Sequence, residues 1–277
     1  MNLSGKRIIL TGAAGGIGYR LALLLASKGA RLALVERNAQ RLAEICAEIN
    51  QSGGNAVAIE LDMTSEGAAD KVVAATLQSL GGIDIVINNA GIMDFTLYDR
   101  QSPERIAQVI NVNVIAPMLL VRAVLPHLLA QNSGRIVNIG SAFGSIGFAH
   151  FAAYCTSKFA MRGFSESLRR ELVDSQVGVT YVSPRAAKTA LNDEITTQML
   201  VETKTNMDEP DYVAEQIVRS IEQEAKEYFI GQPESFFARL NGMFPRLVDG
   251  GLLKNTRIAR KYACQKNNPS TTPRSSR

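Results

Sequence analysis

The chain has 277 residues, of which 46% are hydrophobic and 20% charged, a composition that supports the sizeable core of a large α/β domain. No apolar run approaches the ~18 residues of a membrane span, and the run at residues 8–10 is too short for a signal peptide, so a cytoplasmic protein is predicted. Two histidines and three widely spaced cysteines, Cys46, Cys155 and Cys264, indicate neither a metal site nor a disulfide framework.

The first predicted strand covers residues 7–10 and is followed by TGAAGGIG and a helical pattern that ends near Gly29. This order is typical of dinucleotide binding, because glycines let the backbone approach a pyrophosphate and the helix N-terminus meets its charge. A tight turn between strand and helix is the alternative. The candidate cofactor contacts are Gly12, Gly15, Gly16, Ile17 and Gly18.

The second predicted strand, residues 31–35, leads into Glu36 and Arg37, where an adenosine ribose is expected. Glu36 would accept hydrogen bonds from both ribose hydroxyls, whereas Arg37 would attract the 2′-phosphate of NADP. Because the glutamate comes first and residue 15 is not basic, NAD is favoured over NADP. A helix over 39–50 and a strand at 56–60 precede Asp62, which is either an adenine contact or an acid near the next helix N-terminus.

A fourth strand, residues 83–87, runs into NNAG at residues 88–91, where small and amide side chains suit a ligand crevice formed by Asn89, Ala90 and Gly91. A helix near Pro103, a long apolar helix and a strand at 135–140 follow. Strands that alternate with helices in this way predict an α/β fold with a Rossmann-type, doubly wound, mostly parallel sheet and helices on both faces.

The fifth strand delivers Ser141 at its carboxyl end, thirteen residues before Tyr154. Tyr154 and Lys158 are four residues apart, so they share one face of the helix that the following apolar pattern predicts. A neighbouring cation lowers the pKa of a phenol from ~10 toward neutrality, which would make Tyr154 a general acid/base. Taken alone, the pair also fits an exposed helical tyrosine and lysine.

Together, TGAAGGIG, NNAG, Asn113 in NVN, Ser141 and YCTSK resemble the classical short-chain dehydrogenase/reductase family, from about Lys6 to Ile230. The resemblance implies an NAD(P)-dependent oxidoreductase that transfers a hydride between nicotinamide and a carbonyl or alcohol substrate. It further implies that Tyr154 is the acid/base, Ser141 holds the substrate oxygen, Lys158 binds the nicotinamide ribose and lowers the pKa of Tyr154, and Asn113 holds a relay water. Family members commonly form homodimers or homotetramers. A non-catalytic NAD(P)H-binding sensor or scaffold is the alternative, which the complete set of four residues disfavours.

The segment after the sixth strand departs from the family pattern, because SPRAAKT has Arg185 where the family has glycine. Pro184 and Thr189 keep their positions, and Thr189 would bond the nicotinamide carboxamide. Arg185 is predicted to point to solvent, with a narrowed site or a contact with an acidic substrate as alternatives. Residues 190–208 fall where the family has its substrate lid, and their Met and Leu side chains favour an apolar substrate or, equally, packing of the lid against the body.

The C-terminal part is predicted to form an amphipathic basic extension, residues 232–264, after a catalytic domain of residues 1–231 and before a disordered tail of residues 265–277. From Phe244 onward the chain has eight Lys/Arg and one Asp, while the whole chain carries +4. The extension would contact an anionic membrane surface, cap the substrate pocket or pack across a subunit interface. No nucleic-acid partner is predicted.

Overall fold

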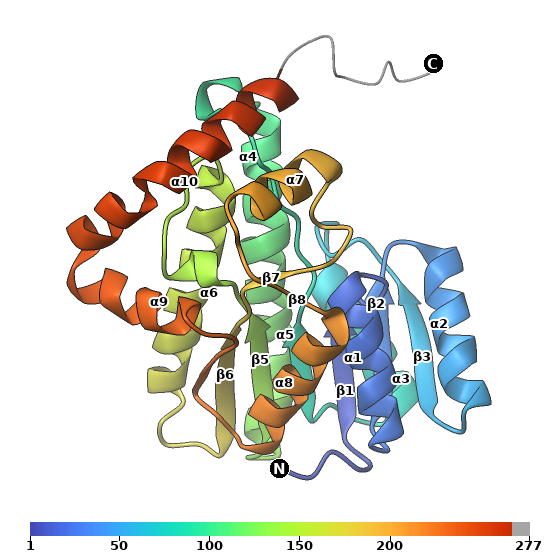
Figure 1. The fold of residues 1–277 in the computed structure, drawn as a ribbon. Coiled ribbons are helices and arrows are strands. Elements are labelled where there is room, and N and C mark those ends of the chain that lie inside the picture. Colours follow the sequence, from blue (N-terminus) through green and yellow to red (C-terminus); the bar gives the residue numbers. More distant parts are fainter. Residues whose placement is uncertain (268–277) are drawn as a thin grey trace.

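Seven strands form one parallel sheet in a computed structural model that describes residues 1–267 (Figure 1). Their order across the sheet is β3-β2-β1-β4-β5-β6-β9, which confirms the predicted doubly wound fold. The strands are β1 (Arg7–Thr11), β2 (Arg31–Glu36), β3 (Asn55–Glu60), β4 (Ile85–Asn88), β5 (Gly134–Ile139), β6 (Val177–Ser183) and β9 (Glu227–Phe229).

Helices cover both faces of the sheet, because successive strand residues point to opposite sides. In β1, Ile8 and Leu10 pack toward one face and Ile9 toward the other, and all three are fully buried. The first face is covered by α1 (Gly16–Ser27), α2 (Ala39–Gln51) and α8 (Pro210–Glu222). The second is covered by α3 (Ala68–Leu80), α5 (Ala116–Ala130) and α6 (Ala152–Glu171).

The chain winds outward in both directions from the pair β1 and β4, which are neighbours in the sheet but not in sequence. The connections that follow β1 and β4 therefore leave toward opposite faces of the sheet. Between them a crevice opens at the carboxyl edge, where ligands bind in sheets of this kind. The glycine loop follows β1 and the NNAG segment follows β4, so the fold brings both motifs to this crevice.

One continuous helical stretch, Pro103–Ala130, is long and apolar enough to span a membrane by length and composition, with a mean hydropathy of 1.8. Of that window, 44% is buried inside the fold, where α5 packs against α3. The stretch consists of α4 (Pro103–Ile110), a π-helical turn η2 (Asn111–Ile115) and α5, and a short 3₁₀ turn η1 (Tyr98–Arg100) precedes it. Core packing thus accounts for the buried part of this apolar stretch, whereas Met118, Leu119 and Leu129 of α5 remain exposed.

The C-terminal extension folds into two helices, α9 (Glu234–Met243) and α10 (Pro245–Lys266), which meet at Phe244. It is not separate from the domain, because α10 packs against the lid helix α7 (Glu194–Glu202) above the carboxyl edge of the sheet (Figure 1). Gln265 and Lys266, expected to be disordered, belong to α10. Residues 268–277 of the predicted tail lie outside the described part.

Candidate active site

The glycine loop between β1 and α1 is packed so closely at Gly12 and Gly18 that neither position has room for a side chain. Gly12 has φ +67°, a region that favours glycine, and a Cβ on Gly18 would lie 2.0 Å from the Gly12 carbonyl oxygen. The Asn89 amide donates to the carbonyl oxygens of Thr11 and Gly12, both at 3.1 Å. The first residue after β4 therefore fixes the loop after β1, across the crevice.

The loop leads into α1, whose N-terminus suits an anion. Among the described residues no side chain caps this end, and its first turn has no acidic residue. The backbone N–H groups of that turn thus point toward the crevice with the positive end of the helix dipole behind them. A pyrophosphate fits this arrangement.

A cleft of about 380 Å³ runs along the carboxyl edge between the glycine loop and the segments after β2, β3 and β4. Most of the predicted cofactor residues line it: Gly12, Gly15, Gly16, Ile17, Gly18, Glu36, Arg37, Asp62, Asn89, Ala90, Gly91 and Thr189. Three predicted cofactor contacts, Tyr154, Lys158 and Pro184, do not line it. The Pro184 carbonyl oxygen instead accepts the Ala142 N–H at 2.8 Å. Sequence reasoning missed Leu61, Met63, Ile92, Gln108 and Val112, although two of these flank Asp62 just beyond β3.

Glu36 and Arg37, which carry opposite charges, both line the end of the cleft where the ribose is expected. The Glu36 carboxylate accepts the Arg37 N–H at 2.8 Å and the Ala14 N–H at 3.4 Å, so it is turned toward the glycine loop. Arg37 is exposed at the same end of the cleft. Asp62 accepts hydrogen bonds from the Thr64 N–H and hydroxyl, which together with nearby Arg37 lower its pKa despite some burial. Asp62 thus shapes a local turn and lines the cleft, but it does not cap the next helix, whose N-cap is Gly67.

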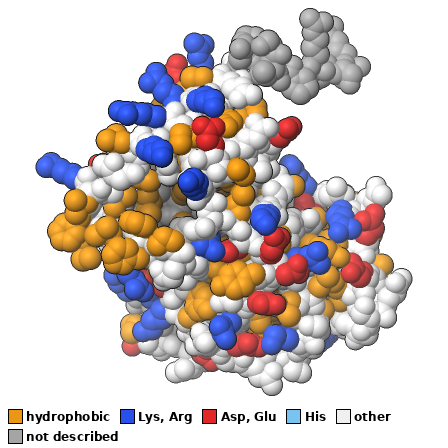
Figure 2. Space-filling view, in the orientation of Figure 1, with side chains coloured by type: hydrophobic (Ala, Val, Ile, Leu, Met, Phe, Trp, Pro, Cys, Tyr) orange, Lys and Arg blue, Asp and Glu red, His pale blue; other side chains and the backbone are white. Residues whose placement is uncertain are grey.

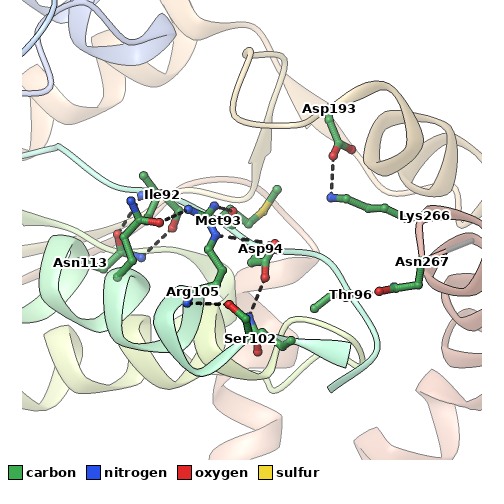
Figure 3. Close-up of polar contacts among 12 residues, drawn as sticks. Ile92, Met93, Asp94, Thr96, Ser102, Arg105, Asn113, Asp193, Lys266 and Asn267 are labelled. Atoms are coloured by element: carbon green, nitrogen blue, oxygen red, sulfur yellow. Dashed lines mark hydrogen bonds and ion pairs between the residues drawn. The ribbon is translucent and has the colours of Figure 1, made fainter. Parts of the chain in front are cut away.

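Asn113 lies next to the cleft residues Gly91 and Ile92, in the π-helical turn η2, a deviation from α-helix that is frequent at functional sites. Its side-chain oxygen accepts the Ile92 N–H at 2.8 Å, and its amide donates to the Ile92 carbonyl (Figure 3). The same amide also donates to the Ser157 hydroxyl. A Cβ on Gly91 would lie 3.4 Å from the Asn113 side-chain oxygen and 3.6 Å from Lys158 Nζ. Gly91, which lines the cleft, therefore lies directly beside Asn113 and Lys158, although these two side chains are not part of the cleft lining.

Tyr154 and Lys158 are both buried on the inner face of α6, with 7% and 6% of their surfaces exposed. Lys158 Nζ donates to the Ile139 carbonyl at 3.1 Å and lies 5.7 Å from the centre of the Tyr154 ring. Ser141, at the end of β5, accepts the Phe143 N–H at 3.1 Å and caps the 3₁₀ turn η3 (Ala142–Gly144). The structure thus brings together the four residues predicted to be catalytic.

The predicted lowering of the Tyr154 pKa is wrong for the protein without cofactor. Burial raises the pKa of this phenol well above its ordinary value, and the neighbouring Ser141 side chain offsets this only in part. Burial also lowers the pKa of Lys158 to about 8. At neutral pH the site therefore holds a protonated phenol beside an ammonium group that is close to losing its proton.

Tyr154 belongs to a cluster of apolar side chains. The Phe143 ring lies 5.4 Å from that of Phe148 and 5.2 Å from that of Phe151, and Phe151 stacks on Phe95 at 4.8 Å. This aromatic cluster also packs against side chains from the lid helix and from α10, namely Met199, Leu200, Ala259 and Ala263. The apolar cluster that contains Tyr154 thus includes residues of the C-terminal extension.

Arg185 does not point to solvent, which corrects the prediction made from its charge. Only 18% of its side chain is exposed, and the guanidinium forms a bidentate salt bridge with the Asp208 carboxylate, with N–O distances of 2.9 and 2.7 Å. It also donates to the Gln232 carbonyl at 3.0 Å. Arg185 directly precedes β7 (Ala186–Ala187) and Asp208 ends β8 (Met207–Asp208), so the ion pair joins the two strands of this small sheet at the base of the predicted lid.

Comparison with known proteins gives consistent matches. A family model described as short chain dehydrogenase matches residues 6–200. The ketoacyl reductase HetN of Nostoc sp. is 32% identical over 231 residues, which cover 83% of this chain and 80% of HetN. The 3-oxoacyl-[acyl-carrier-protein] reductase FabG of Vibrio cholerae is 35% identical over 209 residues, covering 73% of this chain and 83% of FabG.

A crystal structure of a metagenomic short-chain oxidoreductase in complex with NADP superimposes with a TM-score of 0.69 and 32% identity. It covers 83% of this chain and 96% of the other, so about a sixth of this chain lies outside the shared fold. The resemblance read from the motifs is therefore confirmed, and the chain belongs to the short-chain dehydrogenase family of oxidoreductases.

Proposed function

We propose that this chain interconverts a carbonyl compound and an alcohol with NAD(P), using Tyr154 as acid/base, Ser141 and Lys158 beside it, and Asn113 as the holder of a relay water. The observation that carries this assignment is Gly91, which lines the nucleotide cleft and also lies against Asn113 and Lys158. A nicotinamide cofactor in this cleft would supply or accept the hydride. The substrate oxygen must gain or lose a proton in step, so a proton donor is needed at the inner end of the cleft.

The residues divide this work by position. Tyr154 stays protonated at neutral pH because burial raises its pKa, so it is ready to donate a proton during carbonyl reduction. The Lys158 ammonium would stabilise the phenolate left behind, since two groups of opposite charge in a buried site attract strongly. Ser141 would donate its hydroxyl to the same substrate oxygen.

We further propose NAD as the preferred cofactor, although the relative of known structure was solved with NADP. Support comes from Glu36, whose carboxylate is oriented by two backbone N–H groups at the ribose end of the cleft. A 2′-phosphate there would face this negative charge. Arg37 in the same lining is the feature that would favour NADP.

An apolar substrate is part of this proposal, because aromatic and aliphatic side chains surround Tyr154. We also propose a cytoplasmic location, which the three free cysteines support, and assembly into a homodimer or homotetramer. In this proposal the C-terminal extension makes a peripheral contact with a membrane.

The test begins with fluorescence titration of the purified protein with NADH and with NADPH, followed by a screen of ketones and aldehydes at 340 nm. Tyr154→Phe should lower kcat by about 10²–10⁴-fold and leave the NADH affinity unchanged, because the hydroxyl serves proton transfer and not cofactor binding. Turnover that survives this substitution would refute the mechanism. Glu36→Ala should shift the binding preference toward NADPH, whereas Arg37→Ala should shift it toward NADH. Tighter binding of NADPH by the wild type would refute the NAD preference.

A non-catalytic sensor would bind the cofactor equally well and would reduce none of the carbonyl compounds in the screen. Tyr154→Phe would then change nothing.

A further inference from the structure

Helices α9 and α10 present large apolar side chains to solvent instead of burying them. Small residues make the inward contacts: Ala238, Ala259 and Ala263 are at most 4% exposed. Five large apolar side chains around the helix junction are between 43% and 66% exposed, namely Phe236, Phe237, Met243, Phe244 and Leu247. We call these five the apolar patch, and Figure 2 shows hydrophobic side chains gathered over this junction.

The position of the patch is fixed by contacts on the inner side of both helices. The Asn241 amide donates to the Ser145 carbonyl at 2.9 Å, and α10 is held at its far end by an ion pair between Lys266 and Asp193. The patch therefore sits on an anchored surface. A cluster of exposed aromatic and aliphatic side chains of this kind is typical of an interaction site.

Positive charge flanks the apolar patch. Lys and Arg side chains follow α10 (Figure 2), and four of them, Arg246, Lys254, Arg257 and Arg260, are exposed. Among the described residues no carboxylate forms an ion pair with any of these four, and Asp249 is the only acid of α10. The surface thus combines apolar side chains with a one-sided charge.

This combination selects one kind of partner. A second copy of the chain, packed patch to patch, would bring these cations close to their own symmetry mates, and like charges would oppose association. An anionic bilayer meets both features, because its acyl region accepts the apolar side chains while its headgroups attract the cations. We propose that α9 and α10 form a docking surface for anionic membranes, which deepens the proposed function by placing the apolar cluster that contains Tyr154 beside a lipid surface.

Cosedimentation of the full chain with vesicles tests the proposal without any enzymatic readout. Vesicles of phosphatidylcholine with phosphatidylglycerol should bind the protein at low salt, vesicles of phosphatidylcholine alone should not, and high salt should weaken binding. Equal binding to both kinds of vesicle, or to neither, would overturn the proposal. Because the readout is binding, failure of the proposed reaction would leave this result unaffected.

Two sets of variants separate the contributions. Phe244→Ser with Leu247→Ser should reduce binding at least about tenfold, because both side chains are more than half exposed and serve only the bilayer. Lys254→Gln and Arg257→Gln should each reduce it by about fivefold. Val173→Ser is the matched control, since Val173 is 75% exposed and follows α6, outside the apolar patch.

Light scattering on the same variants identifies the competing occupant. If Phe244→Ser with Leu247→Ser lowers the molar mass of the protein and leaves vesicle binding unchanged, the patch joins copies of the chain and the proposal is wrong. Unchanged molar mass with lost vesicle binding supports the membrane.

Discussion

Lys158 is a buried ammonium group, and its titration links stability to pH. Its pKa falls from an ordinary value of 10.5 to about 8 because burial disfavours the charged form. Because the pKa is lower in the folded state, burying the charged ammonium lowers the free energy of unfolding, and this effect is complete below about pH 8. The penalty disappears as the pH rises toward the unfolded-state value.

Lys158→Met should therefore stabilise the protein at pH 7 by up to about 3 kcal/mol, since the shift spans roughly two and a half pH units. The gain should shrink as the pH is raised from about 8 to above 10, and turnover should be lost. Urea unfolding across this pH range measures the effect, with exposed Lys226→Met as the control. A stability difference that does not change with pH would contradict the assignment.

Arg185 and Asp208 form an ion pair in which both side chains are largely removed from water, with 18% and 7% exposed. Removing one charge of such a pair leaves the other without its partner, which costs much more than losing a surface pair. Asp208→Asn should lower the unfolding free energy by about 3 kcal/mol. It should also loosen the lid base, because the pair spans β7 and β8.

The neighbouring Glu209 gives a matched comparison in thermal unfolding experiments. Its carboxylate pairs with Lys188 in the open, with 62% and 53% exposed, so Glu209→Gln should cost less than about 1 kcal/mol. Similar losses for Asp208→Asn and Glu209→Gln would show that the buried pair has no special structural role.

The lid helix α7 is held at both ends by α10. Lys266 Nζ lies 2.6 Å from the carboxylate of Asp193, which caps the start of α7, and the Tyr262 hydroxyl donates to Glu202 at its end (Figure 3 shows the Lys266 contact). The next residue, Asn267, accepts a hydrogen bond from Thr96 on the segment after β4. Helix α10 and Asn267 therefore connect α7 to the segment after β4.

Lys266→Met should release the amino end of the lid while keeping most of the apolar contact of the side chain. Burial alone would raise the Asp193 pKa, but hydrogen bonds from Lys266 and Thr196 outweigh it and hold the pKa low, so the contact stabilises the fold above pH 4 and is lost as the pH falls further. Hydrogen exchange at residues 193–202 should become about tenfold faster at neutral pH. Lys254→Met on the same helix should leave exchange unchanged. Equal protection in both variants would show that the contact between Lys266 and Asp193 does not hold the start of α7.

At the scale of elements, local patterns predicted what depends on neighbours in sequence. Strands β1 and β4 are short apolar runs, and the glycine loop directly follows β1. Each of these patterns lies within a few residues, so it can be read from the sequence alone. The Arg185 contact was missed because its partner is 23 residues away and meets it only through two strands of two residues each. Ala259 and Ala263 look like helix formers, and only the assembled fold shows that they cover the aromatic cluster. Pro245 alone signals the break between α9 and α10.

At the scale of the whole molecule, two of the apolar surfaces exposed among the described residues differ in the charge around them. The α9 and α10 surface is flanked by unpaired cations, whereas the groove between α5 and α6 is lined by apolar side chains and the single charged residue Arg122. Met118, Leu119 and Leu129 in this groove are 38%, 49% and 43% exposed. A nearly uncharged surface suits contact with an identical surface, because no like charges are brought together.

The protein is therefore expected to be a dimer or tetramer that pairs through α5 and α6. Leu119→Glu should shift the molar mass measured by light scattering toward that of the 30.0 kDa chain, since a charge buried at the centre of an apolar interface costs several kcal/mol per subunit pair. Val201→Glu is the control, because Val201 is 62% exposed on the lid helix, away from the groove. If Leu119→Glu keeps the wild-type molar mass while Phe244→Ser lowers it, the subunits meet through the C-terminal helices and the roles of the two surfaces are reversed.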